Sequence, residues 1–239
     1  MATSKIIKDF TSADISIEIA LKKLRVLLSN LNDDKLTNWT KYELEGYDKG
    51  ADLPKYRVVT GRILSTLIVG TVYDGIKYTN YPLNLVNLSP EKSKEILSSN
   101  VYQSVSSLEV IVNERTTTQK PLPPQIYEGL ATLCGINANI LSAHVEFDYT
   151  VTQDILAKIN GKILDTLLTL EKEFGNLDDL DIDISKKNEN QLRTIVQNIQ
   201  VNLYDNSISI GDNNKIKHSD IVTNKWSLIS SLKELLHIK

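Results

Sequence analysis

One helical pattern constrains the fold of this chain more than any other feature of its sequence. Between residues 152 and about 175, apolar residues recur at helical spacing. The stripe is made of Ile155, Ile159, Ile163, Leu167, Leu170 and Phe174, and it is widened by Leu156, Leu164 and Leu168. A helix that is apolar over this width is buried on more than one side, so we expect a long central helix. Gly161 lies in its middle and predicts the close approach of a neighbouring element.

Two further amphipathic helices are predicted in the N-terminal part of the chain, within Asp14–Arg57. Apolar residues recur at helical spacing from Ile17 to Leu31. After a polar turn, a second helix runs to Gly46, a residue suited to a left-handed C-terminal position. These helices predict a surface on which later segments pack.

Several residues in this region are candidates for a binding groove, because Trp and Tyr often anchor interfaces. The candidates are Trp39, Tyr42, Glu43, Tyr47 and Arg57. Packing of the same side chains in the core is the alternative, and it is the interpretation that the helical pattern favours.

The middle of the chain has the composition of strands. Residues 57–73 are rich in Val, Ile, Leu and Thr, and Asp74-Gly75 is a strong hairpin dipeptide before residues 76–83. Residues 138–151 predict another strand, because polar and apolar side chains alternate between its two faces from Ile140 to Phe147. We therefore expect an α+β domain over residues 1–176, with a predominantly helical core and a small, mostly antiparallel sheet.

The composition changes after residue 176. Residues 177–190 are predicted to form an acidic linker, and residues 191–239 an Asn-rich strand segment followed by a terminal amphipathic helix. Sheet edges with free N–H and C=O groups recruit partners, so this tail is a candidate for assembly. Completing the domain's own sheet is the alternative. The candidate interface residues are Ile199, Val201, Leu203, Ile208, Ile210, Asp212, Asn213 and Asn214.

The composition indicates no particular chemistry. A net charge of −3 argues against a dedicated nucleic-acid-binding domain. The single cysteine, Cys134, fits a reducing compartment and is interpreted as a small buried hydrophobe, with a Cys/His pair with His144 as the alternative. Asp181 and Asp183 are interpreted as solvated linker residues. We predict no catalytic set, metal or cofactor, and the lack of a signal or membrane-spanning pattern predicts a cytoplasmic protein.

The order of these segments resembles the AbiTii domain of bacterial abortive-infection proteins. The resemblance covers about residues 4–176 and is carried by residues 16–47, 52–57, 61–83, 121–130 and 145–175. The aromatic-rich strand that usually precedes the long helix in the family appears here as AHVEFDYTV, without tryptophan. The resemblance implies phage defence, in which the infected cell dies or stops growing, and action together with a partner component. It transfers no catalytic residue.

We therefore expect a non-enzymatic interaction or regulatory component that forms a homo-oligomer through its C-terminal strands and acts with a partner defence protein or a phage protein. A nuclease-like toxin effector and a sensor of a ligand or phage protein are the alternatives. The sequence indicates no membrane or nucleic-acid partner.

Overall fold

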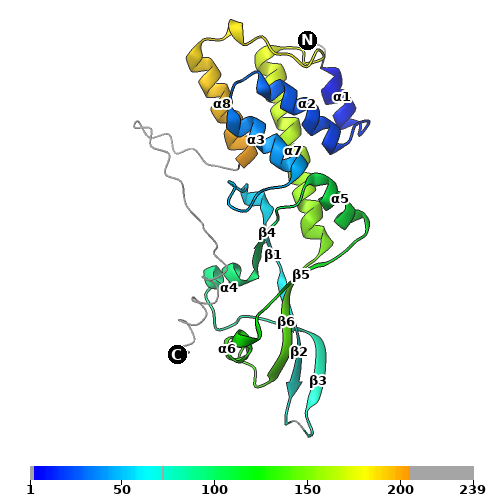
Figure 1. Cartoon of the computed structure of the whole chain (residues 1–239), viewed down its shortest axis with the longest axis vertical. Helices are drawn as coiled ribbons and strands as arrows, with labels where there is room; N and C mark the ends of the chain where they lie inside the picture. The colour runs from blue at the N-terminus through cyan, green and yellow to red at the C-terminus, as the bar shows by residue number, and fades with distance from the viewer. Residues whose placement is uncertain (1–2, 72, 205–239) are drawn as a thin grey trace. The chain divides into compact units, whose positions relative to one another are not determined.

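The computed structural model describes residues 3–71 and 73–204, and they divide into two compact units (Figure 1). The first unit takes its described residues from Met1–Val58, Asn100–Arg115 and Thr152–Asn214. The second contains Val59–Ser99 and Thr116–Val151. Helices with a small antiparallel sheet make an α+β fold, as the sequence predicts.

The first unit is helical. Helix α2 packs on α1, α3 and α5, and α3 also packs on α5 and α8, while α7 runs through the unit (Figure 1). The helices are α1 (Lys5–Thr11), α2 (Ile17–Ser29), α3 (Asp34–Glu45), α5 (Val105–Asn113), α7 (Tyr149–Phe174) and α8 (Glu189–Tyr204).

Local chemistry sets the ends of α2 and α3. The side chain of Ser16 accepts a hydrogen bond from the Ile19 N–H, and that of Asp33 accepts one from the Leu36 N–H. Gly46 ends α3 at a φ of 96°, a conformation that glycine adopts readily. The helices predicted within Asp14–Arg57 are therefore confirmed.

Helix α7 is the predicted central helix. Five of its six stripe residues are buried, Ile155, Ile159, Ile163, Leu167 and Leu170, and Phe174 is half-buried. The predicted widening holds only in part, because Leu156 is buried but Leu164 is half-buried and Leu168 is 45% exposed. The close approach expected at Gly161 is wrong, because apart from the glycine's own neighbours in α7 no described atom lies within 4 Å of the position that a Cβ would take there. The glycine lies on an exposed part of the helix.

Two glycine substitutions are expected to change stability in opposite directions. Gly161→Ala adds a strong helix former where space is open, so the free energy of unfolding should rise by about 1 kcal/mol. Gly61→Ala places a Cβ against the backbone oxygen of Glu146, so we expect a loss of about 1–3 kcal/mol. Urea unfolding of both variants measures the pair, and a destabilising Gly161→Ala would contradict the account of α7.

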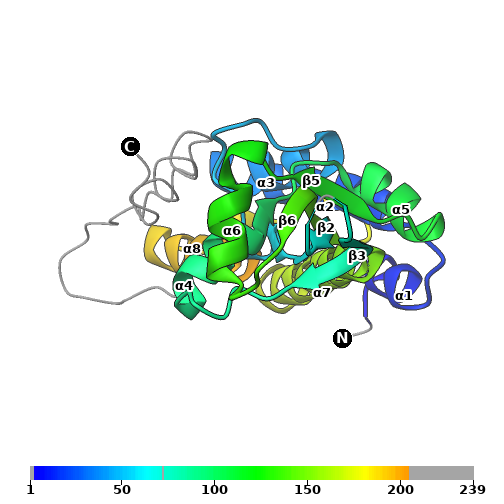
Figure 2. The same cartoon turned by 90° about the horizontal axis from the view of Figure 1, so that it is seen from below.

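The second unit is built on a four-stranded sheet in the order β3-β2-β6-β5, with each neighbouring pair antiparallel. Helix α6 packs on β6 (Figure 2). The strands of this sheet are β2 (Arg62–Val69), β3 (Ile76–Leu83), β5 (Thr118–Pro121) and β6 (Asn139–Phe147). A separate two-stranded sheet pairs β1 (Val58–Thr60) with β4 (Ser98–Asn100). The helices are α4 (Pro90–Leu97) and α6 (Tyr127–Leu133). Three short 3₁₀ turns, η1 (Lys55–Arg57), η2 (Pro124–Ile126) and η3 (Ile184–Lys186), complete the described elements.

The strands predicted at the start of the tail are wrong, because residues 189–204 form helix α8. Ile195, Ile199 and Leu203 are buried, whereas Val201 is half-buried. A spacing of four residues fits both an alternating strand and one helical turn, and burial of these residues on one face decides for the helix. The other candidate interface residues, Ile208, Ile210, Asp212, Asn213 and Asn214, lie outside the described residues.

Residues 177–190 carry few regular elements. Leu177 and Ile182 are buried in this segment, and Asp183 caps η3 by accepting a hydrogen bond from the Ser185 N–H. The acidic segment is thus anchored by two of its four apolar side chains, Leu177 and Ile182.

Candidate functional site

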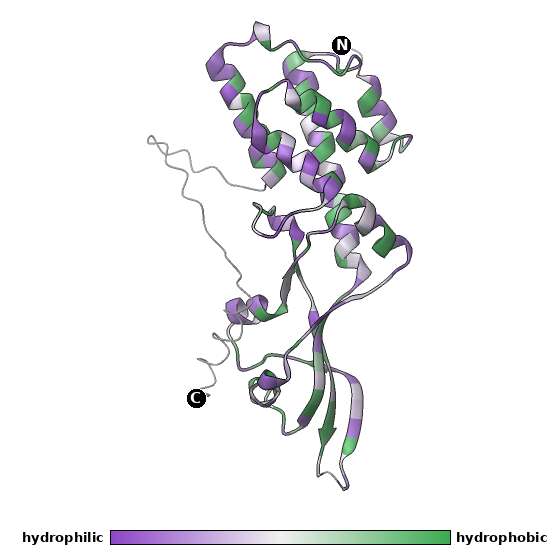
Figure 3. Cartoon of the chain, in the orientation of Figure 1, coloured by the Kyte–Doolittle hydropathy of each residue, from purple (hydrophilic) through white to green (hydrophobic). Residues whose placement is uncertain are grey.

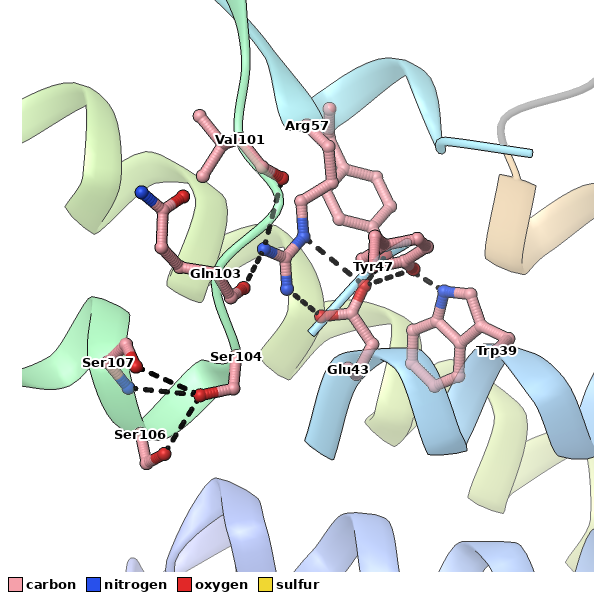
Figure 4. Close-up of polar contacts among 10 residues, drawn as sticks. Trp39, Glu43, Tyr47, Arg57, Val101, Gln103, Ser104, Ser106 and Ser107 are labelled. Atoms are coloured by element: carbon pink, nitrogen blue, oxygen red, sulfur yellow. Dashed lines mark hydrogen bonds and ion pairs between the residues drawn. The ribbon is translucent and has the colours of Figure 1, made fainter. Parts of the chain in front are cut away.

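Four of the five predicted groove residues, Trp39, Glu43, Tyr47 and Arg57, come together, but in the core of the first unit (Figure 4). Trp39, Glu43 and Arg57 are fully buried and Tyr47 is 5% exposed, while Tyr42 is half-buried and stacks on Tyr47. Core packing, the alternative favoured by the helical pattern, describes their burial.

A single carboxylate organises this cluster. Glu43 Oε1 accepts hydrogen bonds from the hydroxyls of Tyr47 and Tyr56, each at 2.7 Å, and Arg57 Nη2 donates a hydrogen bond to Glu43 Oε2. Trp39 Nε1 donates to the Tyr56 hydroxyl at 2.8 Å. We call Trp39, Glu43, Tyr47, Tyr56 and Arg57 the Glu43 network. The sequence does not identify Tyr56 as a member of this network. Its role follows only from the structure, where its hydroxyl lies between Trp39 and Glu43.

The guanidinium of Arg57 also fixes a distant segment. Its Nη1 donates to the backbone oxygen of Gln103 at 2.6 Å and approaches that of Val101 at 3.5 Å (Figure 4). The Tyr47 N–H donates to the Tyr102 oxygen at 2.7 Å. The network therefore joins α3, η1 and the segment before α5 within the first unit.

The charges of this network are stabilised by each other. Burial opposes the charge of Arg57, but the charge and hydrogen bond of Glu43, together with Tyr47 and Tyr56, raise the Arg57 pKa. Burial, followed by the charge of Glu43, raises the pKa of Tyr47 and of Tyr56 well above the ordinary range, so both hydroxyls stay protonated as donors.

Lys162 extends the network to α7 and α8. Its side chain is 7% exposed, and its Nζ lies 5.2 Å from the centroid of the Tyr56 ring. The same Nζ donates to the backbone oxygen of Asn202 in α8 at 2.5 Å. In the sequence, Lys162 stands directly before Ile163 of the apolar stripe. A lysine at such a position indicates a buried polar contact. The side chains of Glu43, Arg57 and Lys162 are thus buried in the first unit. Their hydrogen bonds connect separate segments of that unit, and they do not line its hollow.

The remaining candidates from the sequence are Cys134 and the acidic residues of the segment 177–190. No group of three or more His, Cys, Asp or Glu residues is placed to hold a metal ion there. Burial raises the pKa of the Cys134 thiol to about 11, which keeps it protonated and a poor nucleophile at neutral pH. Hydrogen bonds from Ser185 and Lys186 lower the pKa of Asp183 to about 2.

A shallow hollow of about 520 Å³ lies on the first unit and is bordered by charged pairs. Lys22 pairs with Glu18 at 2.5 Å and Arg25 lies 3.6 Å from Glu45. Its lining residues are Glu18, Lys22, Arg25, Val26, Ser29, Leu44 and Glu45. The predicted groove residues are absent from this lining, and the neighbouring opposite charges neutralise one another.

The sheet of the second unit carries an exposed apolar surface, which we call the hairpin patch. It consists of Val69, Ile76, Tyr78 and Tyr81, whose exposed fractions are 46%, 62%, 39% and 40%. Val69 pairs with Ile76 across the hairpin, Leu67 with Tyr78 and Ser65 with Tyr81, so alternate residues of β2 place all four on one face. The Tyr78 and Tyr81 rings meet edge to face at 5.8 Å. Figure 3 shows the apolar colouring on β2 and at the hairpin end of β3.

Helices of the described residues are all too short or too polar to cross a lipid bilayer.

Comparison with known proteins gives one match. No curated protein and no solved structure matches the chain. The family model AbiTii matches residues 3–195, from the start of the first unit into α8. Because this match spans most of the 239 residues, the chain belongs to the AbiTii family of abortive-infection proteins.

Proposed function

We propose that this chain is a non-enzymatic interaction component of an abortive-infection system, which assembles with further copies of itself and acts with a partner defence protein or phage protein. Membership of the AbiTii family supports the setting in phage defence. The observation that carries the interaction role is the hairpin patch, where two tyrosines and two aliphatic residues are exposed together. Contiguous apolar surface of this kind marks interaction sites, and tyrosine is enriched in them.

Assembly is assigned to the residues after α8. Ile199 and Leu203, which the sequence placed in the interface, are buried in the first unit. Ile208, Ile210 and Asp212–Asn214 remain as candidates for contacts between copies, together with the amphipathic segment that follows them.

The enclosure of the Glu43 network disfavours it as a catalytic centre, since Glu43 and Arg57 are fully buried and Lys162 is 7% exposed. A substrate would have to displace the packed side chains of Trp39 and Tyr56 to reach them.

Phage infection tests the interaction role in cells that carry the chain in its own genomic context. We expect phage plating to fall and infected cells to be lost before phage release with the native chain. Ile76→Asp should abolish both effects, because it places a charge in the hairpin patch at a side chain that is 62% exposed. Val86→Asp is the matched control, because Val86 is 68% exposed in the same unit and lies outside the patch.

Full protection by Ile76→Asp would refute the patch as the working surface. If the chain were toxic when expressed alone, and a single Asp or Glu substitution removed the toxicity without unfolding it, a toxin effector would replace the interaction role.

A further inference from the structure

We propose that the hairpin patch is the docking site for the amphipathic segment 224–239 of a second copy of this chain. The inference rests on the proposed function, because it names the surface and the segment through which copies assemble.

The edge of β3 is a poor template for an added strand. Two of its residues, Thr79 and Asn80, stand opposite Thr66 alone, because Ser65 pairs with Tyr81 and Leu67 with Tyr78. Asn80 has a φ of 53° at this bulge. Bulges, lysine and proline are the features that protect sheet edges from pairing, and β3 also carries Lys77 and Pro82.

One face of the same hairpin, unlike its edge, is suited to binding a partner. Val69, Ile76, Tyr78 and Tyr81 present apolar side chains there, next to Leu67, which is buried on the same face. Such a surface suits a helix that lays an apolar stripe on it, the second general mode of peptide recognition besides strand addition. The structure therefore favours docking on the face over pairing at the edge.

The segment 224–239, NKWSLISSLKELLHIK, has the matching pattern. Its predicted stripe is Leu228, Leu232, Leu235 and Leu236, spaced as on one face of a helix. Burying a leucine side chain contributes about 1.5–3 kcal/mol, so a stripe of this kind drives association with an apolar surface.

Charge supports the same occupant. The segment has Lys225, Lys233 and Lys239 against Glu234 and is therefore basic. The turn that joins β2 to β3 contributes Asp74, which accepts hydrogen bonds from the Thr71 hydroxyl and N–H, and these bonds lower the pKa of its carboxyl. Asp74 is thus an acid on the hairpin, near Lys77 of β3, that a lysine of the segment can pair with.

The length of the intervening chain allows exchange between copies. The stretch from residue 205 to 223 spans on the order of 60 Å when extended, at about 3.3 Å per residue. Reciprocal docking of two segments on two patches closes a symmetric dimer, whereas docking within one chain leaves no patch for assembly.

Cross-linking between two single-cysteine chains tests the docking directly, in a Cys134→Ala background. One full-length chain carries Ile76→Cys and the other Ser231→Cys, next to the leucine stripe. We expect a short bifunctional maleimide to join them into a conjugate of two chains. Val86→Cys with Ser231→Cys is the control and should give no conjugate.

Self-association of the full chain is a second measurement, which tests the docking site even if a cysteine variant is unstable. Ile76→Asp should weaken self-association of the full chain at least about tenfold, a loss of about 1.4 kcal/mol, while Val86→Asp leaves it unchanged. A chain that stays oligomeric with Ile76→Asp and gives no conjugate would overturn the docking site but not the assembly role. Conjugation only within a chain that carries both cysteines would refute exchange between copies. A monomer at all concentrations would refute both proposals.

Discussion

Replacing Glu43 with alanine is expected to lower the free energy of unfolding by about 3–5 kcal/mol. The substitution removes the acceptor of the Tyr47 and Tyr56 hydroxyls and leaves the guanidinium of Arg57 buried without its carboxylate. An uncompensated buried charge is far more costly than a lost surface pair. Chemical denaturation followed by circular dichroism measures the loss.

Glu45→Ala is the matched control for this prediction. Glu45 lies on the same helix, its side chain is 56% exposed, and it faces Arg25 at 3.6 Å. Exposed pairs of this kind contribute about 0–1 kcal/mol. The double variant Glu43→Met/Arg57→Met should lose less than the sum of its two single variants, because it removes both buried charges together. If Glu43→Ala cost no more than Glu45→Ala, the network would not stabilise the first unit.

Removal of α8 is expected to have the second large effect. A chain that ends at Asn190 loses the buried side chains of Ile195, Ile199 and Leu203, each of which contributes about 1.5–3 kcal/mol. It also loses the hydrogen bond from the Gln200 amide to Asp33 at 2.9 Å. The sum is comparable with the total stability of a domain, about 5–15 kcal/mol, so the first unit should no longer unfold cooperatively.

A chain that ends at Asn206 keeps α8 and is the control. It should retain the helical circular dichroism signal per residue and the unfolding midpoint of the described fold. Equal unfolding midpoints for the chains ending at Asn190 and Asn206 would mean that α8 is not part of the folded unit.

Much of the fold follows from local sequence chemistry. Ser16 and Asp33 were predictable caps because the interactions they make span only three residues. The stripe of α7 was predictable because its period excludes a strand. Helix α8 was not predictable in the same way. Ile199 and Leu203 are four residues apart, and this spacing is compatible with both an alternating strand and a helix.

The candidate site was predictable only in part. Trp39 and Glu43 are four residues apart, which places them on one side of α3, whereas Tyr47 follows the end of that helix at Gly46. Their partner Arg57 reaches Gln103, 46 positions further along the chain, and no local pattern encodes that contact. The hairpin patch was missed for a similar reason, because which side chains of β2 and β3 stay uncovered depends on tertiary packing.

The most direct test of the assembly role is the solution mass of the intact chain beside the chain that ends at Asn206, measured by light scattering over a range of concentrations. We expect the intact chain to form a dimer or larger oligomer and the shortened chain to be a folded monomer. An intact chain with the monomer mass of 26.9 kDa at every concentration would contradict the account.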